Sequence, residues 1–231
     1  MELKFLGRGS AFNTKEGNTS AYYKLNNGED MILIDCGESV FQQIINKNIL
    51  NNVKNIIVLI THLDSDHVGS LSSLIHYCHY CCNDIKPNIY FPDEDILTLL
   101  ELQGHKLKED FTWNSPIRIK YLEINSYPTK HIDKLNCYGY FINLPNGKNI
   151  WYSGDCSYPT NIDILFDIDE FYQDTCLSDY KGNVHTSLRL LCEKIPKEYV
   201  DYRNKIYCMH LDCGELIEKA KSEGFNVVEC E

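Results

Sequence analysis

The sequence lacks the features of a membrane or secreted protein. Its apolar runs are far shorter than the ~20 residues that a membrane-spanning helix needs. The start of the chain, Met1–Phe5, has no signal-peptide pattern. No linker, low-complexity tract or internal repeat interrupts its 231 residues. We therefore expect a cytoplasmic protein without a membrane partner, folded as one domain over residues 1–231, a length that buries one substantial core.

Positive charge is scarce in this chain. It has 22 Lys and Arg against 33 Asp and Glu, which gives a net charge of -11 at pH 7. Binding to a nucleic acid depends on Lys and Arg side chains that neutralise phosphates. This composition argues against a long nucleic acid as the usual partner and favours a small-molecule ligand.

Cysteine, in contrast, is abundant, with 11 residues. A disulfide scaffold is disfavoured because the chain is large and lacks a secretory signal, so we expect reduced thiols. Cys78, Cys81 and Cys82 form a Cys-x2-Cys-Cys pattern that suggests half of a zinc finger. No pair of matching spacing follows, which favours thiols packed on a helix.

Strand-like and helix-like segments alternate along the chain, as is typical of the α/β class. The expected strands are 2–6, 21–25, 31–35, 56–60, 117–124, 138–144, 149–153, 205–209 and 226–228. The expected helices are 40–47, 68–78, 93–102, 184–193 and 215–222.

The most informative segment follows the apolar run 56–60. His62, Asp64, Asp66 and His67 place two imidazoles and two carboxylates within six residues. An apolar run that ends in such a cluster is typical of a buried strand that carries ligands at its C-terminal end, where open α/β sheets hold their active sites. Imidazole and carboxylate groups bind zinc and similar divalent ions. Four donors exceed the need of one catalytic ion, so the cluster suggests two ions.

Three more candidate ligands stand at the ends of expected strands: His131, Asp155 and His210. A single histidine after a strand is more often solvated or hydrogen-bonded than a ligand, and an Asp after Gly is usually a turn residue. Together with the cluster at His62–His67, however, the three favour a shared metal site.

This ordered set resembles the metallo-β-lactamase fold superfamily, whose signature is His-x-His-x-Asp-His, a lone His, a Gly-Asp turn and a final His. Phe5–Ser10 and Asp35–Glu38 are similar to motifs of its phosphodiesterase branch, which includes the tRNA 3′-processing endonucleases. Gln173–Thr175 and Val184–Ser187 resemble that branch more loosely. Compact relatives include the anti-Pycsar cyclic-nucleotide phosphodiesterases. The resemblance implies an α/β, αββα sandwich fold.

The resemblance also implies a set of metal ligands. Two divalent ions would bind, with Zn²⁺ as the expected metal and Mn²⁺ or Fe²⁺ as alternatives. The implied ligands are His62, Asp64 and His131 for the first ion, Asp66, His67 and His210 for the second, and Asp155 as a bridge. A hydroxide bridging the two ions would attack phosphorus.

Three residues carry catalytic roles in this interpretation: Asp66, His185 and Asp174. Asp66 would act through the metal. His185 would donate a proton or a hydrogen bond to the leaving or phosphoryl oxygen, and Asp174 would orient His185. The alternative for His185 is a residue near a helix N-terminus with no catalytic role.

The short interval between His131 and Asp155 limits the size of the expected substrate. Only 23 residues lie there, where the tRNA-processing enzymes carry a long basic arm. The resemblance therefore implies hydrolysis of a small phosphodiester, with a 3′,5′-cyclic mononucleotide as the leading candidate. The alternatives are a ribonuclease, thioesterase or lactamase of the same fold, and a metal-binding protein that sequesters nucleotides without catalysis. A homodimer is expected by analogy with relatives.

Asp64 departs from the superfamily pattern, which has a histidine at this position. A carboxylate adds negative charge and a harder donor, so we expect a less acidic bound water and greater tolerance of Mn²⁺ or Fe²⁺. The Asp64→His variant should shift preference toward Zn²⁺. Metal analysis and rates for both forms test this, and identical preference and activity would contradict it.

Overall fold

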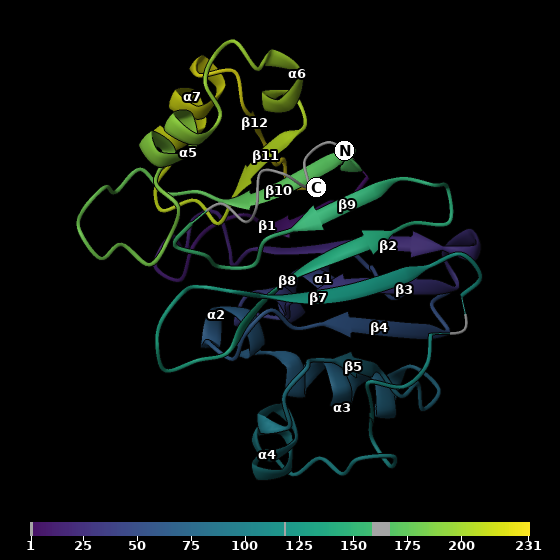
Figure 1. The fold of residues 1–231 in the computed structure, drawn as a ribbon. Coiled ribbons are helices and arrows are strands. Elements are labelled where there is room, and N and C mark those ends of the chain that lie inside the picture. Colours follow the sequence, from purple (N-terminus) through teal and green to yellow (C-terminus); the bar gives the residue numbers. More distant parts are fainter. Residues whose placement is uncertain (1, 118, 159–166) are drawn as a thin grey trace. The chain divides into compact units, whose positions relative to one another are not determined.

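The computed structural model describes residues 2–117, 119–158 and 167–231. It contains two compact units. The N-terminal unit comprises Glu2–Gly7, Gly17–Pro116 and Cys230–Glu231, and the C-terminal unit comprises Arg8–Glu16 and Ile117–Glu229. Each unit has its own six-stranded sheet (Figure 1).

The sheet of the N-terminal unit has the strand order β1-β2-β3-β4-β5-β6. Its strands are β1 (Lys4–Gly7), β2 (Ser20–Leu25), β3 (Asp30–Ile34), β4 (Asn55–Leu59), β5 (Asn88–Tyr90) and β6 (Thr112–Trp113). β1, β2 and β3 pair antiparallel, and β3 to β6 pair parallel. The short 3-10 helix η1 (Asn26–Gly28) joins β2 to β3. The helices of this unit are α1 (Val40–Asn46), α2 (Ser65–Val68), α3 (Leu71–Cys81) and α4 (Asp95–Leu102).

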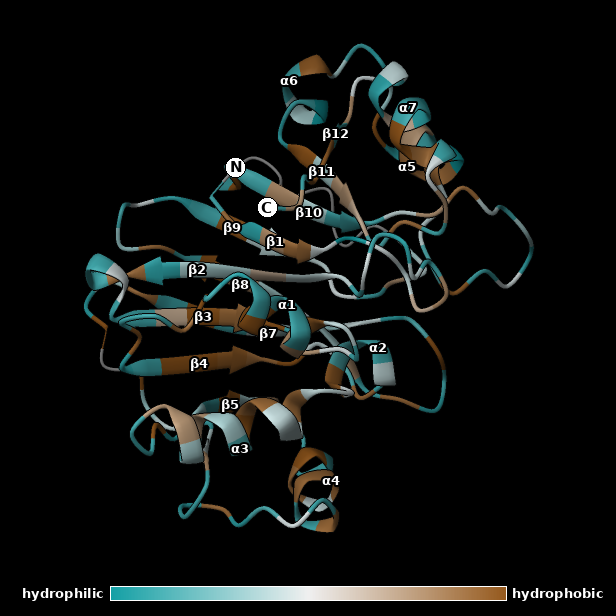
Figure 2. Cartoon of the chain, turned by 180° about the vertical axis from the view of Figure 1, so that it is seen from behind, coloured by the Kyte–Doolittle hydropathy of each residue, from teal (hydrophilic) through white to brown (hydrophobic). Residues whose placement is uncertain are grey.

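The two central parallel strands show why the sheet forms here. All five residues of β3 and four of the five in β4 are buried. Their apolar sequences have no alternation, which is typical of strands covered on both faces, and both are coloured as hydrophobic in Figure 2. Because they are parallel and in register, from Asp30 opposite Asn55 to Ile34 opposite Leu59, their C-terminal ends meet at one edge of the sheet.

The C-terminal unit repeats this plan. Its strands are β7 (Glu123–Thr129), β8 (Cys137–Asn143), β9 (Asn149–Tyr152), β10 (Glu170–Asp174), β11 (Ile206–Met209) and β12 (Asn226–Val227). β7, β8 and β9 pair antiparallel, and β9 to β12 pair parallel. The helices are α5 (Leu188–Lys194), α6 (Val200–Arg203) and α7 (Glu215–Ser222). Two sheets thus share one topology although the sequence shows no repeat.

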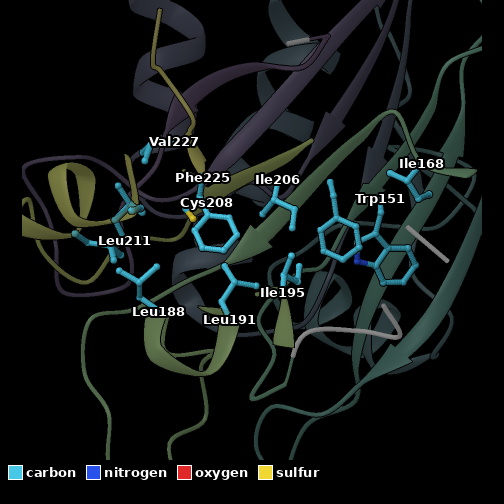
Figure 3. Packing of buried hydrophobic residues seen from close by; sticks show 13 residues of the cluster. Trp151, Ile168, Leu188, Leu191, Ile195, Ile206, Cys208, Leu211, Phe225 and Val227 are labelled. Atoms are coloured by element: carbon cyan, nitrogen blue, oxygen red, sulfur yellow. The ribbon is translucent and has the colours of Figure 1, made fainter. Parts of the chain in front are cut away.

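The core of the C-terminal unit packs helix against sheet. Leu191 of α5, Ile206 of β11 and Phe225 are buried in one cluster (Figure 3), together with Trp151 of β9 and Leu216 of α7. This burial fixes the parallel strands β9, β10 and β11, whose C-terminal ends carry the candidate ligands.

The α/β class expected from the sequence is confirmed, but several elements differ. The strand expected at 117–124 is instead β7, which runs over Glu123–Thr129 as a largely exposed strand. Pro128 is tolerated there because β7 is an edge strand. Four short elements were not expected: β5, β6, β10 and α6. In β10 the polar residues Glu170, Gln173 and Asp174 are all buried, so no apolar pattern marks it as a strand.

Two expected helices also begin or end elsewhere. The helix expected over 68–78 is divided at Gly69–Ser70 into α2 and α3. The helix expected over 184–193 begins only at Leu188, because the Ser187 hydroxyl accepts a hydrogen bond from the Leu190 amide as an N-cap. Cys78 packs fully buried in α3, and burial raises the pKa of its thiol, so the neutral thiol is favoured. No helix among the described residues could span a membrane.

Candidate metal-binding site

In the N-terminal unit, a buried carboxylate organises the loop after β4. Asp35 follows β3, and its carboxylate accepts hydrogen bonds from the Thr61 amide (2.8 Å), the Thr61 hydroxyl (2.9 Å) and His67 Nδ1 (2.8 Å). A carboxylate only accepts, so the His67 proton lies on Nδ1 and the lone pair on Nε2. This is the tautomer that a histidine needs to bind a metal through Nε2.

Four predicted ligands converge at this loop. His67 Nε2 lies 3.3 Å from Asp66 Oδ2, and His62 Nε2 lies 3.4 Å from Asp64 Oδ2. The two imidazole rings are 4.0 Å apart. Donor atoms at about 2.0–2.1 Å from one tetrahedral zinc ion are about 3.3 Å from each other, so both pairs have the spacing of neighbouring ligands. Asp64 is the most exposed of the four, with 41% of its side chain accessible.

A close backbone contact fixes α2 and its ligands in place. The Cys36 amide donates to the His67 carbonyl at 2.7 Å. A Cβ atom at Gly37 would lie 1.8 Å from the carbonyl oxygen of Asp66. Only glycine allows this approach, so the Asp35–Glu38 motif both orients His67 and admits the α2 backbone.

In the C-terminal unit, three parallel strands deliver the remaining candidates. Asp155 lies just beyond β9, Asp174 ends β10, and His210 follows β11. Because β9, β10 and β11 are parallel neighbours, these residues share one edge of the sheet. Asp155 Oδ2 lies 3.4 Å from His210 Nε2 and 3.8 Å from His131 Nε2.

Hydrogen bonds also orient the imidazoles of this unit. His131 Nδ1 donates to the Val184 carbonyl at 2.9 Å, which leaves its Nε2, on the side of Asp155, as the lone-pair nitrogen. His185 Nδ1 donates to Asp174 Oδ2 at 2.9 Å. The other Asp174 oxygen lies 3.4 Å from His210 Nδ1. One buried aspartate therefore contacts two histidines.

The charges of His185 and Asp174 stabilise each other. Burial alone would lower the pKa of His185, but the adjacent Asp174 carboxylate outweighs it and raises that pKa. Burial alone would raise the pKa of Asp174, but the His185 ring outweighs it and holds that pKa below its usual value. The pair favours an imidazolium beside a carboxylate.

The donor set of the C-terminal unit fits a metal ion. Asp155, Asp174, His185 and His210 each have a potential ligand atom, and these atoms lie within 4.8 Å of one another. Because Asp174 and His185 are engaged with each other, Asp155 and His210 are the members of this group that an ion would use. Three of the four residues are buried. Imidazole nitrogen and carboxylate oxygen are the ligands of zinc and other first-row divalent ions.

Each predicted residue thus lies within a cluster of its own unit. His62, Asp64, Asp66 and His67 gather in the N-terminal unit, and the structure also brings together the five candidates of the C-terminal unit: His131, Asp155, Asp174, His185 and His210. That the two sets bind the same pair of ions stays a prediction. The role of Asp35 was not predicted. Its signal in the sequence is an acidic residue directly after an apolar strand.

The role of Asp35 in orienting the predicted ligand His67 can be tested directly. In Asp35→Asn, an amide N–H₂ facing His67 would favour the proton on Nε2 and block metal binding there. We expect zinc affinity to fall about 10- to 100-fold, measured by titration against a competing chelator. Asp30→Asn is the matched control, a buried aspartate at the start of β3 that accepts from Asn55 at 2.7 Å. Equal zinc affinity in both variants would contradict the assigned role.

Comparison with known proteins identifies the family. The sequence model described as "Anti-Pycsar protein Apyc1" matches residues 1–230. The Anti-Pycsar protein Apyc1 of Bacillus phage BSP38 is 26% identical over 233 residues, which cover 90% of this chain and 88% of the phage protein. Ribonuclease Z of Methanococcus aeolicus is 30% identical over 158 residues, or 62% of this chain and 46% of that enzyme.

Solved structures identify the fold. The metallo-β-lactamase fold protein YhfI from Bacillus subtilis superposes with a TM-score of 0.71 at 16% identity, over 98% of this chain and 95% of YhfI. The expected fold class is therefore confirmed. The chain has the metallo-β-lactamase fold and belongs to the Anti-Pycsar protein Apyc1 family.

Proposed function

We propose that the chain is a metal-dependent phosphodiesterase whose substrate is a small phosphodiester, with a 3′,5′-cyclic mononucleotide as the leading candidate. The observation that carries this proposal is the placement of Asp155 beside His131 and His210, next to the His185–Asp174 pair, in a member of the Apyc1 family. A similarity to ribonuclease Z supports phosphodiester chemistry, since ribonucleases cleave such bonds.

We further propose that seven residues bind two divalent metal ions, with Zn²⁺ expected. These are the ligands predicted from the sequence: His62, Asp64, Asp66, His67, His131, Asp155 and His210. Two such ions, when bound, lower the pKa of a water molecule and neutralise phosphoryl oxygens. The oriented tautomers of His67 and His131 support this assignment because each presents Nε2 as a lone-pair donor.

His185 has the features of a proton donor in this reaction. Its Nδ1 is engaged by Asp174, so in the protonated ring Nε2 is the nitrogen that can give a proton to the leaving oxygen. The raised pKa keeps the ring protonated to higher pH than an ordinary histidine. Asp174 acts as the positioning residue.

The interval between His131 and Asp155 supports a small substrate. It consists of β8, β9 and the tight turn at Pro145–Gly147, where the Gly147 amide donates to Leu144 at 2.8 Å. No extended arm is inserted in this hairpin, and the net charge of -11 gives little attraction for RNA. Homodimer formation stays a prediction.

A substrate panel tests the proposed function. Metal-loaded protein should convert 3′,5′-cyclic AMP, GMP, CMP or UMP to nucleoside monophosphate, and a chelator should abolish turnover. The products are measured by chromatography. Turnover of none of the four, with robust cleavage of RNA or a thioester instead, would overturn the substrate assignment.

The Asp155→Ala variant tests whether the chain hydrolyses a cyclic nucleotide or only sequesters it. If the chain is an enzyme, this variant loses substrate consumption, because the carboxylate that faces His131 and His210 is gone. Asp133→Ala, an exposed aspartate near His131, is the control. A wild-type protein that binds cyclic nucleotide stoichiometrically without consuming it would support the sequestering alternative.

Loss of the proposed proton donor should affect kcat in a way that depends on the leaving group of the substrate. His185→Gln should lower kcat by about 10²- to 10⁴-fold with little effect on zinc content. A substrate with an acidic leaving group, such as bis(4-nitrophenyl) phosphate, needs less protonation and should lose much less activity. The control is His79→Gln, which removes a histidine from an exposed His79–Asp84 pair (2.6 Å). Equal losses on both substrates would exclude the proton-donor role.

A further inference from the structure

The N-terminal unit contains a cavity that the proposed reaction does not use. Its volume is about 380 Å³, within the range of about 300–1,000 Å³ that is common for small-molecule sites. None of its lining residues is a predicted metal ligand. The residues that matter here are Lys4, Tyr22, Tyr23, Lys24, Lys47 and Glu231.

The cavity lies toward the other end of the unit from the ligand loop. Lys24 of β2 pairs with Met31, and Met31 pairs with Ile56 in the first half of β4. The ligand His62 lies beyond the C-terminal end of β4. At about 3.3 Å per residue, Ile56 and Leu59 alone are about 10 Å apart. Lys47 likewise stands at the C-terminal end of α1.

The cavity gathers positive charge in an acidic chain. Three lysines and two glutamates, Glu2 and Glu231, line it, which gives a small excess of positive charge although the net charge of the chain is -11. Partial burial lowers the pKa of Lys24, and the positive charge of Lys4 lowers it further. Lys4 and Lys24 are therefore close enough to repel each other, and the nearby Glu231 carboxylate partly offsets this effect. An anion between the two lysines would relieve their repulsion.

A carboxylate already occupies this place. Glu231 Oε1 lies 2.5 Å from Lys4 Nζ, and Glu231 Oε2 accepts a hydrogen bond from the hydroxyl of the buried Tyr22. Lys47 donates to the backbone oxygen of Glu231. Two ammonium groups and one hydroxyl thus converge on the side-chain and backbone oxygen atoms of a single residue, Glu231.

The ion pair between Lys4 and this internal ligand is exposed to solvent. Lys4 and Glu231 are 57% and 36% exposed, and ion pairs between exposed side chains contribute little to stability. A phosphate monoester carries close to two negative charges at neutral pH and three acceptor oxygens. It would satisfy the three lysines and the Tyr22 hydroxyl better than one carboxylate does.

We propose that this cavity is a second anion site, which binds a phosphate monoester in place of the Glu231 carboxylate. The site is independent of the proposed hydrolysis, because it shares no residue with the metal ligands. Inorganic phosphate and a nucleoside monophosphate offer the same chemistry, and the experiment distinguishes them.

Titrations of the metal-loaded protein, followed by amide NMR shifts, test this site. AMP and inorganic phosphate should each move the amides of Tyr23, Lys24 and Asn48, and adenosine should not. Tighter binding of AMP than of phosphate would identify a nucleotide site, and equal affinities a phosphate site.

Three variants of the cavity and one control sharpen the test. Lys24→Gln and Lys47→Gln should each weaken binding about tenfold, the loss of one charge-assisted hydrogen bond. Glu231→Gln should tighten it, since the competing carboxylate is gone. Lys54→Gln removes an exposed lysine paired with Glu29 and should leave affinity unchanged.

The proposal is overturned by any of three results. These are shifts confined to the amides of His62–His67, equal shifts with adenosine, and the same affinity in the cavity variants as in Lys54→Gln. Cyclic-nucleotide turnover in Lys24→Gln should equal wild type, so failure of this proposal and failure of the proposed function are separate outcomes.

Discussion

The hydrogen bond from a histidine Nδ1 to an acceptor held in place by the fold is the interaction on which both ligand clusters depend. Asp35 receives it from His67, the Val184 carbonyl from His131, and Asp174 from His185. Each bond fixes the orientation of the ring. In His67 and His131 it leaves Nε2 as the lone-pair nitrogen before any ion arrives, and in His185 it leaves Nε2 as the nitrogen that can give a proton. Burial of a carboxylate without hydrogen-bond partners would destabilise the fold. The bonds that orient His67 and His185 therefore also stabilise the buried carboxylates of Asp35 and Asp174.

The topology explains why these partners are available. In each sheet, parallel strands end at one edge, and the residues just beyond them lie side by side. Asp35 and Thr61 meet beyond β3 and β4, and Asp155, Asp174 and His210 meet beyond β9, β10 and β11. The same strand plan thus produces a polar cluster in each unit, although the two sequences differ.

Much of the candidate site could be predicted from the sequence because its residues stand in a compact motif. His62, Asp64, Asp66 and His67 follow an apolar strand that is easy to identify, and the structure places all four together. β10 could not be predicted, since its buried Glu170, Gln173 and Asp174 are polar. Their burial is compensated by hydrogen bonds, both within the strand, from Tyr172 to Glu170 (2.5 Å), and across the fold, from the Cys156 amide to Asp174 (2.9 Å).

The sequence by itself determined the α/β class, the main ligand motif and the family resemblance, because these depend on local patterns of residue type. Only the tertiary structure decided which groups orient the ligands, that a Cβ at position 37 would collide with Asp66, and that Lys4, Lys24 and Lys47 line one cavity. These relations join residues far apart in the chain. Strand pairing creates them, and no local pattern encodes it.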